Sequence, residues 1–301
     1  VLANICKHTP ELAQKIVDAD GVRLVSRLLE SSDIFLKRQV ACFLAQVAKH
    51  SHDNALITAN HIVLPKILDC LQSVQDSYVL INSCTFVRVV ANHGQNFATS
   101  LVESGIIEPL IKCISDPRYK SQHAPLGAIG AIAVQSEDLA LKVRDAGAIP
   151  YAVSVLSDYT IQTYIRSEAA NCLKNIGSLS AELTHEIGWH KGFTALYDSF
   201  NQKDNSPGGS RLKETCRKAF KNLSINCTEL TYLSPLIELD TDPVLLQYIL
   251  KQCSIVLPTD PEQKILFIRN NKLMILQKLL GKKLPPTIYE FIHSVNGAFP
   301  V

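Results

Sequence analysis

The sequence is short of several features that mark particular protein classes. Among its 301 residues it has one methionine, one tryptophan and only 7% aromatic residues. Basic and acidic residues number 30 and 28, so the net charge of +2 gives no general case for binding nucleic acid or a membrane. An apolar run of about 18 residues and a signal peptide are also missing, which predicts a soluble intracellular protein of the cytoplasm.

Catalytic and metal-binding signatures are missing as well. The sequence contains no GxGxxG, P-loop, HExxH or GxSxG pattern, and none of its nine cysteines forms CxxC. The cysteines lie mostly among aliphatic residues at helical spacing, which predicts reduced, buried apolar side chains. Carboxylate pairs such as Glu137 and Asp138 lie at helix starts and complement the helix dipole. We therefore predict no enzyme, no metal site and no cofactor.

The chain does contain an internal repeat. His8 and His50 are 42 positions apart, His50 and His93 are 43 apart, and Gly105 and Gly147 are again 42 apart. Each unit has a short apolar-periodic stretch, a glycine, a second stretch, a polar break and a longer third stretch. The apolar positions of the third stretch recur at three and four, as in Val40, Phe43, Leu44 and Val47.

The breaks predict three helices in each unit. Glycine can adopt the left-handed conformation that ends a helix, and proline is tolerated in a first turn. The joint glycines are Gly21, Gly105, Gly147 and Gly192, and the prolines are Pro65, Pro109 and Pro150. The predicted helix caps are Thr9, Ser32, Ser51, Ser136, Ser180 and Asp260. The histidines at His8, His50 and His93 suit a structural role at the C-terminus of the third helix.

A period near 42 with three helices and a glycine joint resembles the armadillo repeat. HEAT repeats are the nearest alternative, but they have two helices and less glycine at this joint. The resemblance implies an all-α, right-handed superhelical solenoid over residues 1–301. The expected divisions are a partial repeat 1–8, repeats at about 9–50, 51–93, 94–136, 137–179 and 180–226, divergent repeats 227–281 and a C-terminal helix 282–301. Val63 stands where the second joint would have glycine, so this joint departs from the pattern.

Two segments carry further expectations. The stretch from Phe200 to Arg211 has the composition of a mobile loop between the second and third helices of its repeat. The start at Val1, inside a helical pattern, suggests a piece of a longer protein cut within a repeat. Self-association into a homo-oligomer through the exposed first repeat is then expected, over Leu12, Ile16, Val17 and Leu28. Trp189 and His190 are expected to pack in a repeat joint.

The third helices provide the candidate binding surface. In armadillo solenoids a polar residue at one recurring position of this helix binds extended peptide backbone, and here that position holds Asn4, Gln46, Val89, Ala131, Asn175 and Asn222. Val89 and Ala131 interrupt the ladder and its tryptophan partners are missing, which argues against a receptor for nuclear localisation peptides. A basic row also falls in these stretches: Lys37, Arg38, Arg88, Arg166, Lys174, Lys218, Lys221 and Lys251. This row is either solvated surface or a groove for an acidic protein partner.

Several stretches narrow the resemblance to one armadillo family. They read HTPELAQKIVDADGV, LKRQVACFLAQVAKHS, CLKNIG, FKNLSINCTELTYLSPLI, LLQYILKQCSIVLPTDPEQKILFI and IYEFIHSVNGAFP. Together they resemble the sperm-associated antigen six family, and KQCSIVLPTDPE is the most specific because generic armadillo repeats lack it. The resemblance implies a non-enzymatic scaffold of the central apparatus in the axoneme of cilia and flagella. It would stabilise the C1 microtubule and be needed for motility, with axonemal proteins and tubulin as partners.

Two alternatives remain open from the sequence. One is a general armadillo adaptor for extended or acidic peptides, of nuclear-transport or adhesion type. The other is an enzyme, or an enzyme accessory, built on a solenoid. The absence of a convergent acid–base constellation argues against the second.

Overall fold

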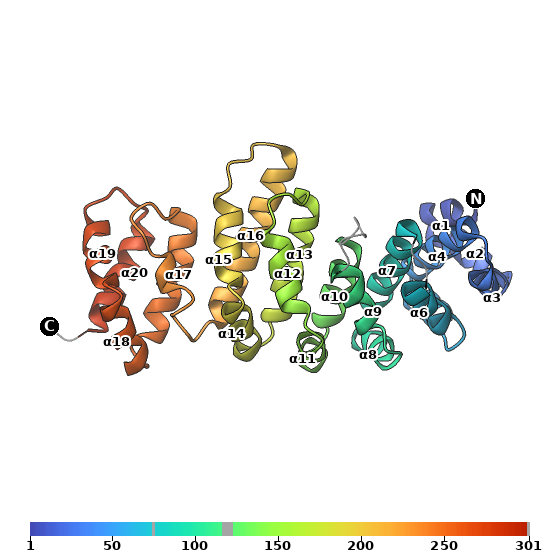
Figure 1. Cartoon of the computed structure of the whole chain (residues 1–301), viewed down its shortest axis with the longest axis horizontal. Coiled ribbons are helices and arrows are strands. Elements are labelled where there is room, and N and C mark those ends of the chain that lie inside the picture. The colour runs from blue at the N-terminus through green and yellow to red at the C-terminus, as the bar shows by residue number, and fades with distance from the viewer. Residues whose placement is uncertain (74–75, 116–122, 300–301) are drawn as a thin grey trace. The chain divides into compact units, whose positions relative to one another are not determined.

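The chain folds almost entirely into helices. The computed structural model describes residues 1–73, 76–115 and 123–299, and within these ranges it contains twenty α-helices, two 3-10 helices and no β-strand (Figure 1). The chain divides into two compact units, Val1–Tyr151 and Ala152–Val301, and each is described by itself. The prediction of an all-α fold is confirmed.

The helices of unit 1 run in groups of three after a first single helix. They are α1 (Leu2–His8), α2 (Pro10–Asp18), α3 (Gly21–Ser26) with the 3-10 helix η1 (Arg27–Glu30), α4 (Ile34–Ala48), α5 (His52–Thr58), α6 (Val63–Ser73), α7 (Ser77–Ala91), α8 (Gln95–Glu103), α9 (Ile107–Ser115), α10 (His123–Ala133) and α11 (Glu137–Asp145). Helix α12 (Ala148–Ser157) crosses the boundary between the units.

Unit 2 continues the pattern and departs from it once. Its helices are α13 (Thr163–Gly177), α14 (Ala181–Trp189), α15 (Gly192–Asn201), α16 (Pro207–Asn226), the 3-10 helix η2 (Ser234–Leu236), α17 (Pro243–Val256), α18 (Pro261–Arg269), α19 (Lys272–Leu280) and α20 (Pro286–Gly297). Between α16 and α17 the chain has only η2 where two helices would be expected. Helices α18 to α20 then form a full group of three, so we propose 261–297 as one complete repeat in place of the predicted division at 281.

The last helix of each group, here called the third helix, packs against the third helix of the next group. In unit 1 these helices are α1, α4, α7 and α10, and in unit 2 they are α13, α16, α17 and α20. The predicted apolar positions of α4 form core, since Val40, Phe43, Leu44 and Val47 are each at most 2% exposed. Apolar burial of about 25 cal/mol per Å² is what makes each group depend on its neighbour.

Side-chain caps fix where many helices begin. The hydroxyl groups of Thr9, Ser51, Ser136 and Ser180 each accept a hydrogen bond from a backbone N–H in the first turn, as predicted. The prediction for Ser32 is wrong. The carboxylate of Asp33 caps α4 instead, accepting from the backbone of Phe35 and Leu36, because a carboxylate at this position also complements the helix dipole.

Most joints between first and second helices take one of two forms, and the joint before Val63 takes neither, as its departure from the glycine pattern predicts. Gly105 and Gly147 have φ angles of +81° and +83°, so the predicted left-handed glycines are confirmed at both places. Gly21 and Gly192 are not left-handed; Asp20 and Lys191 before them are, with φ of 62° and 63°. A Cβ on Gly21 would lie 2.7 Å from the carbonyl oxygen of Ile16, so that glycine serves close helix approach.

The loop predicted at Phe200 to Arg211 is shorter than the composition suggests. Helix α15 ends at Asn201 and α16 already begins at Pro207, with the Ser206 hydroxyl accepting from the backbone N–H of Gly209 at 3.0 Å. A Cβ on Gly209 would lie 2.4 Å from the Asp204 carbonyl oxygen. The glycine pair therefore starts a helix beside a tight connection, which composition alone does not distinguish from a loop.

Side chains from one group complete the helix ends of the group before it. The Nε2 group of His93 donates to the carbonyl of Ala48 at 2.7 Å, and that of His50 donates to the carbonyl of Cys6. Both acceptors belong to the end of the preceding third helix. In unit 2 the amide of Asn226 donates to the carbonyl of Ser178, at the end of α13, at 3.0 Å. The structural role predicted for His50 and His93 is confirmed, with the preceding helix as the one that each completes.

Candidate protein-binding surface

The structure places every predicted site residue on a third helix. Asn4 lies on α1; Lys37, Arg38 and Gln46 lie on α4; Arg88 lies on α7; Arg166, Lys174 and Asn175 lie on α13; Lys218, Lys221 and Asn222 lie on α16. Their surroundings differ, however, and the charges divide into those satisfied inside the protein and those left for solvent or a partner.

Arg38 is satisfied within unit 1. Its Nε donates to the Asp76 carboxylate at 2.8 Å, a second bond from Nη2 makes the pair bidentate, and the guanidinium lies 4.9 Å from the Tyr78 ring centroid. Asp76 also caps α7, accepting from the backbone of Val79 at 3.0 Å. The Arg38 guanidinium holds the pKa of Asp76 below its ordinary value. Arg38 therefore ties α4 to the start of α7.

Arg166 does not lie on the surface, so the prediction that it contributes to an exposed basic row is wrong. The residue is 1% exposed. Its Nε donates to the carbonyl of Leu156 at 2.9 Å, Nη1 donates to Gln202 at 2.6 Å, and Nη2 donates to Ser199 at 2.9 Å. These acceptors lie at the C-terminal ends of α12 and α15, where the helix dipole favours a cation. Burial lowers the pKa of Arg166.

The remaining residues of the basic row and the amide residues of the ladder show intermediate or full exposure. Lys37, Gln46, Lys174, Asn175 and Asn222 are half-buried, and Asn4, Arg88, Lys218, Lys221 and Lys251 are exposed. The Arg88 side chain lies against Gly127 on α10, where a Cβ would come within 2.8 Å of its Nη1. At one of the two interrupted ladder positions, Ala131 is only 5% exposed and has no side-chain amide to bind a peptide. Binding of a peptide by these residues stays a prediction.

On α16 a single acidic residue, Glu214, pairs with two basic side chains. Glu214 accepts from Nε and Nη2 of Arg217, both at 2.7 Å, and lies 3.4 Å from the Lys218 ammonium. The hydrogen bonds from Arg217 lower the pKa of Glu214 to about 2. Arg217 also donates to the Tyr248 hydroxyl of α17 at 2.9 Å, which fixes the position of that ring.

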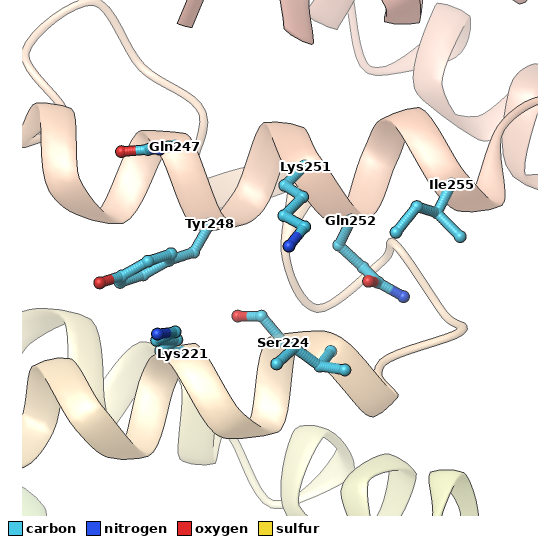
Figure 2. Close-up of a pocket in the computed structure, with 8 residues that line it drawn as sticks. Lys221, Ser224, Gln247, Tyr248, Lys251, Gln252 and Ile255 are labelled. Atoms are coloured by element: carbon cyan, nitrogen blue, oxygen red, sulfur yellow. The ribbon is translucent and has the colours of Figure 1, made fainter. Parts of the chain in front are cut away.

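A groove runs between α16 and α17, both in unit 2. Its cavity measures about 350 Å³ and is lined by Lys221, Ser224, Ile225, Gln247, Tyr248, Lys251, Gln252 and Ile255. Figure 2 shows Tyr248, Lys251 and Gln252 directed from α17 toward Lys221 and Ser224 on α16. The amide of Gln252 is already used, because it donates to the carbonyl of Cys227 at 2.7 Å. The groove lies next to the segment in which η2 replaces two helices.

The groove combines apolar surface with unpaired positive charge. Ile225 and Ile255 are 58% and 56% exposed, an unusual exposure for isoleucine. Among the described residues, neither the Lys221 nor the Lys251 ammonium has a carboxylate within ion-pair distance. The groove is therefore the candidate functional site, and it can accept an apolar side chain together with acidic groups.

Sequence reasoning found the lysines of this site and missed its other walls. Tyr248, Ile225 and Ile255 read as ordinary core positions of helical stretches. The sequence did contain a signal that these isoleucines face away from the core. Ile225 directly follows the buried pair Leu223 and Ser224, and Ile255 lies between the buried residues Cys253 and Val256, so the core-facing positions nearby are already occupied. These side chains line the groove beside segment 227–242, where the chain has only η2.

The structure also bears on four further features considered in the sequence. All nine cysteines are free thiols and eight are buried, as predicted; burial raises the pKa of Cys216 to about 12, which makes it a poor nucleophile. The expectation that Trp189 packs in a joint is wrong, since it is 68% exposed at the end of α14. Within the described ranges no three His, Cys, Asp or Glu side chains are grouped as a metal ion would need. None of the described helices is both long and apolar enough to span a bilayer.

Comparison with known proteins gives partial matches in sequence and broader ones in structure. No protein-family model matches the chain. Sperm-associated antigen 6 from Homo sapiens is 30% identical over 139 residues, and the Mus musculus protein is 31% identical over 139 residues. Each match covers 46% of this chain and 26% of the relative, so the aligned part spans about a quarter of the relatives' length.

The solved structures show the fold. An engineered protein superimposes with a TM-score of 0.74 and 20% identity, covering 99% of this chain and 72% of that one. A designed armadillo repeat protein in complex with the peptide (KR)4 gives a TM-score of 0.67 and 18% identity, covering 74% of this chain and 90% of that one. The chain has the armadillo-repeat fold, and part of it is similar to sperm-associated antigen 6. The predicted α solenoid of armadillo type is thereby confirmed.

Proposed function

We propose that this protein is a non-enzymatic scaffold of the central apparatus in cilia and flagella, where it stabilises the C1 microtubule and its projections. The observation that carries the proposal is the 30% identity to sperm-associated antigen 6 in a chain of the same repeat type. Its localisation would be the axonemal cytoskeleton, its partners axonemal proteins and tubulin, and its role would be needed for motility.

The repeat architecture suits a scaffold for a physical reason. Successive third helices present many weak binding positions along one chain, and a periodic lattice allows several to be occupied at once. Weak contacts then combine through effective concentration, so that strong attachment needs no single deep pocket. The near-neutral net charge of +2 supports recognition by local patches over general attraction to polyanions.

Localisation tests this proposal directly. The chain, fused to a fluorescent protein, would be expressed in a flagellated cell and imaged together with a marker of the central pair. We expect decoration along the axoneme, and we expect removal of the endogenous protein to impair beating. Exclusion of the fusion from the axoneme, with intact motility after removal, would overturn the proposal.

A general adaptor for acidic peptides is the second candidate, and the groove between α16 and α17 favours it. The designed neighbour was solved with a basic peptide, (KR)4. Here the unpaired groups of the groove are the ammonium groups of Lys221 and Lys251, which select the opposite charge. A pull-down from non-ciliated cells that recovers acidic partners through this groove would support the adaptor over an axonemal scaffold.

A further inference from the structure

We propose that the groove between α16 and α17 binds an acidic segment of a partner protein, which inserts one bulky apolar side chain between the two helices. This inference rests on the proposed function as a protein-binding solenoid, whether scaffold or adaptor, and it adds the chemistry of the partner and the place where it docks.

The space and its floor call for an apolar anchor. The cavity of about 350 Å³ is open to solvent along Ile225 and Ile255, which together expose more than half of their surface. Covering these two side chains removes their apolar area from water. An inserted leucine or phenylalanine also has its own apolar area removed from water, and both changes favour binding. Ser224 keeps the centre of the groove free, because its small side chain is only 2% exposed and bonds back to the carbonyl of Phe220 at 2.6 Å.

The polar groups around this floor are hydrogen-bond donors that lack acidic partners. Lys221 stands on α16 and Lys251 on α17, so a bound segment has one ammonium on each side (Figure 2). The two neighbouring cations differ, because Arg217 and Lys218 already bind Glu214. Tyr248 accepts from Arg217, which leaves its own hydroxyl hydrogen for an acceptor on the ligand. Such a set favours carboxylates flanking the apolar anchor.

Binding of synthetic peptides tests the charge rule. The probe is a short fluorescent peptide with a central leucine flanked on each side by two glutamates, measured by fluorescence polarisation with the whole chain. The comparison peptides carry glutamine or lysine in place of glutamate, or alanine in place of leucine. We expect binding of the glutamate peptide that weakens with added salt, and binding at least about tenfold weaker for each comparison peptide.

Matched variants place the binding in the groove. The double variant Lys221→Glu with Lys251→Glu is expected to bind the glutamate peptide about tenfold or more weakly. It is also expected to gain binding of the lysine peptide, which a misfolded protein would not do. Lys278→Glu with Lys283→Glu changes the net charge by the same amount on residues outside the groove, and should leave binding unchanged. Ile255→Ser is expected to reduce the preference for leucine over alanine in the peptide.

Each contrary result has a definite meaning. Equal binding of glutamate and glutamine peptides, or an equal loss in the Lys278 and Lys283 control, would overturn the proposal. Localisation in a flagellated cell separates it from the proposed function. A chain that decorates the axoneme but ignores acidic peptides refutes only the groove, whereas one that binds these peptides but stays out of the axoneme refutes only the axonemal role.

Discussion

Arg166 shows how a single residue can join neighbouring groups of helices. Its guanidinium is buried among three neutral oxygens, from Leu156, Ser199 and Gln202, and stacks 4.6 Å from the Tyr159 ring centroid. A planar fork with five donors can serve three acceptors in fixed directions, which an ammonium group cannot. The residue therefore holds the end of α12 against the end of α15.

Replacing Arg166 should destabilise unit 2 strongly. We expect Arg166→Met to lower the free energy of unfolding by about 2–4 kcal/mol, because it keeps apolar volume but removes three hydrogen bonds, to the buried Leu156 carbonyl and Ser199 hydroxyl and to the half-buried Gln202. Arg166→Lys should recover only part of this loss. Urea unfolding followed by circular dichroism measures both, and Arg211→Met on the exposed part of α16 should stay within about 0.5 kcal/mol of the wild type. Equal effects at the two arginines would contradict this account.

The bidentate pair of Arg38 and Asp76 should make stability depend on pH. Arg38 lowers the pKa of Asp76 below its unfolded value of 3.8, so the stabilisation is present above that pH and is lost as the pH falls through the folded-state value. Asp76→Asn keeps a good helix cap and should cost about 1 kcal/mol at neutral pH. The difference from wild type should vanish under acidic conditions, and at neutral pH it should be smaller in an Arg38→Gln background, where only the backbone N–H groups of Tyr78 and Val79 still favour the carboxylate.

The buried position of Arg166 has a geometric cause that the basic row does not contain. Membership of the third helix does not specify which side of the helix a residue faces. Arg166 and Asn175 are nine positions apart, and at 3.6 residues per turn they point to opposite sides of α13. Helical phase could therefore have assigned Arg166 to the interior, whereas its three acceptors come from residues that no local pattern connects.

At the scale of elements, the glycine pattern predicts the conformation of some joints between first and second helices but not of others. Gly105 and Gly147 take the left-handed conformation, but Asp20, Lys191 and Asn271 do so at three other joints, and the joint between α5 and α6 has no left-handed residue. A lysine in this conformation has no signature in the sequence, because ordinary residues adopt it only when surrounding structure forces them. The order of helices was predictable from periodicity, while the conformation of each joint depended on packing.

The conformations of the joints predict opposite effects on stability for two substitutions. Lys191→Gly should raise the free energy of unfolding by about 0.5–1 kcal/mol, since it relieves the left-handed strain at an exposed residue with φ of 63°. Gly147→Ala should lower it by about 1 kcal/mol, because alanine is strained at φ of +83° although no atom lies within 4 Å of its Cβ. Thermal unfolding of both variants checks the signs, with Lys191→Ala as the control that should change little. A stabilised Gly147→Ala variant would disprove the explanation.

At the scale of the whole molecule, stability is local because each group of helices contacts its sequence neighbours. Within each unit the third helices pack in chain order, α4 on α7 and α13 on α16. In such an architecture, stability approximates a sum of group and nearest-neighbour contributions. The period predicts this principle and marks 227–281 as divergent, but it does not predict that α17 lacks the two helices before it.

Hydrogen exchange should reveal that locality. Arg166→Met is expected to increase amide exchange in α12, α13 and α15, which meet at the guanidinium, and to leave α1 and α4 as protected as in the wild type. Mass spectrometry of peptic fragments resolves these segments. A uniform loss of protection along the chain would show that the molecule unfolds as one cooperative block.

The side chains that complete the preceding helix ends also bear on how the protein is made. His50, His93 and Asn226 each supply a donor to a helix that was synthesised more than forty residues earlier. On the ribosome the N-terminal part of the chain emerges first. The carbonyl groups at these helix ends therefore lack their side-chain donors until the following group of helices has left the exit tunnel. The ends of α1, α4 and α13 are therefore completed only after the following group of helices has been synthesised.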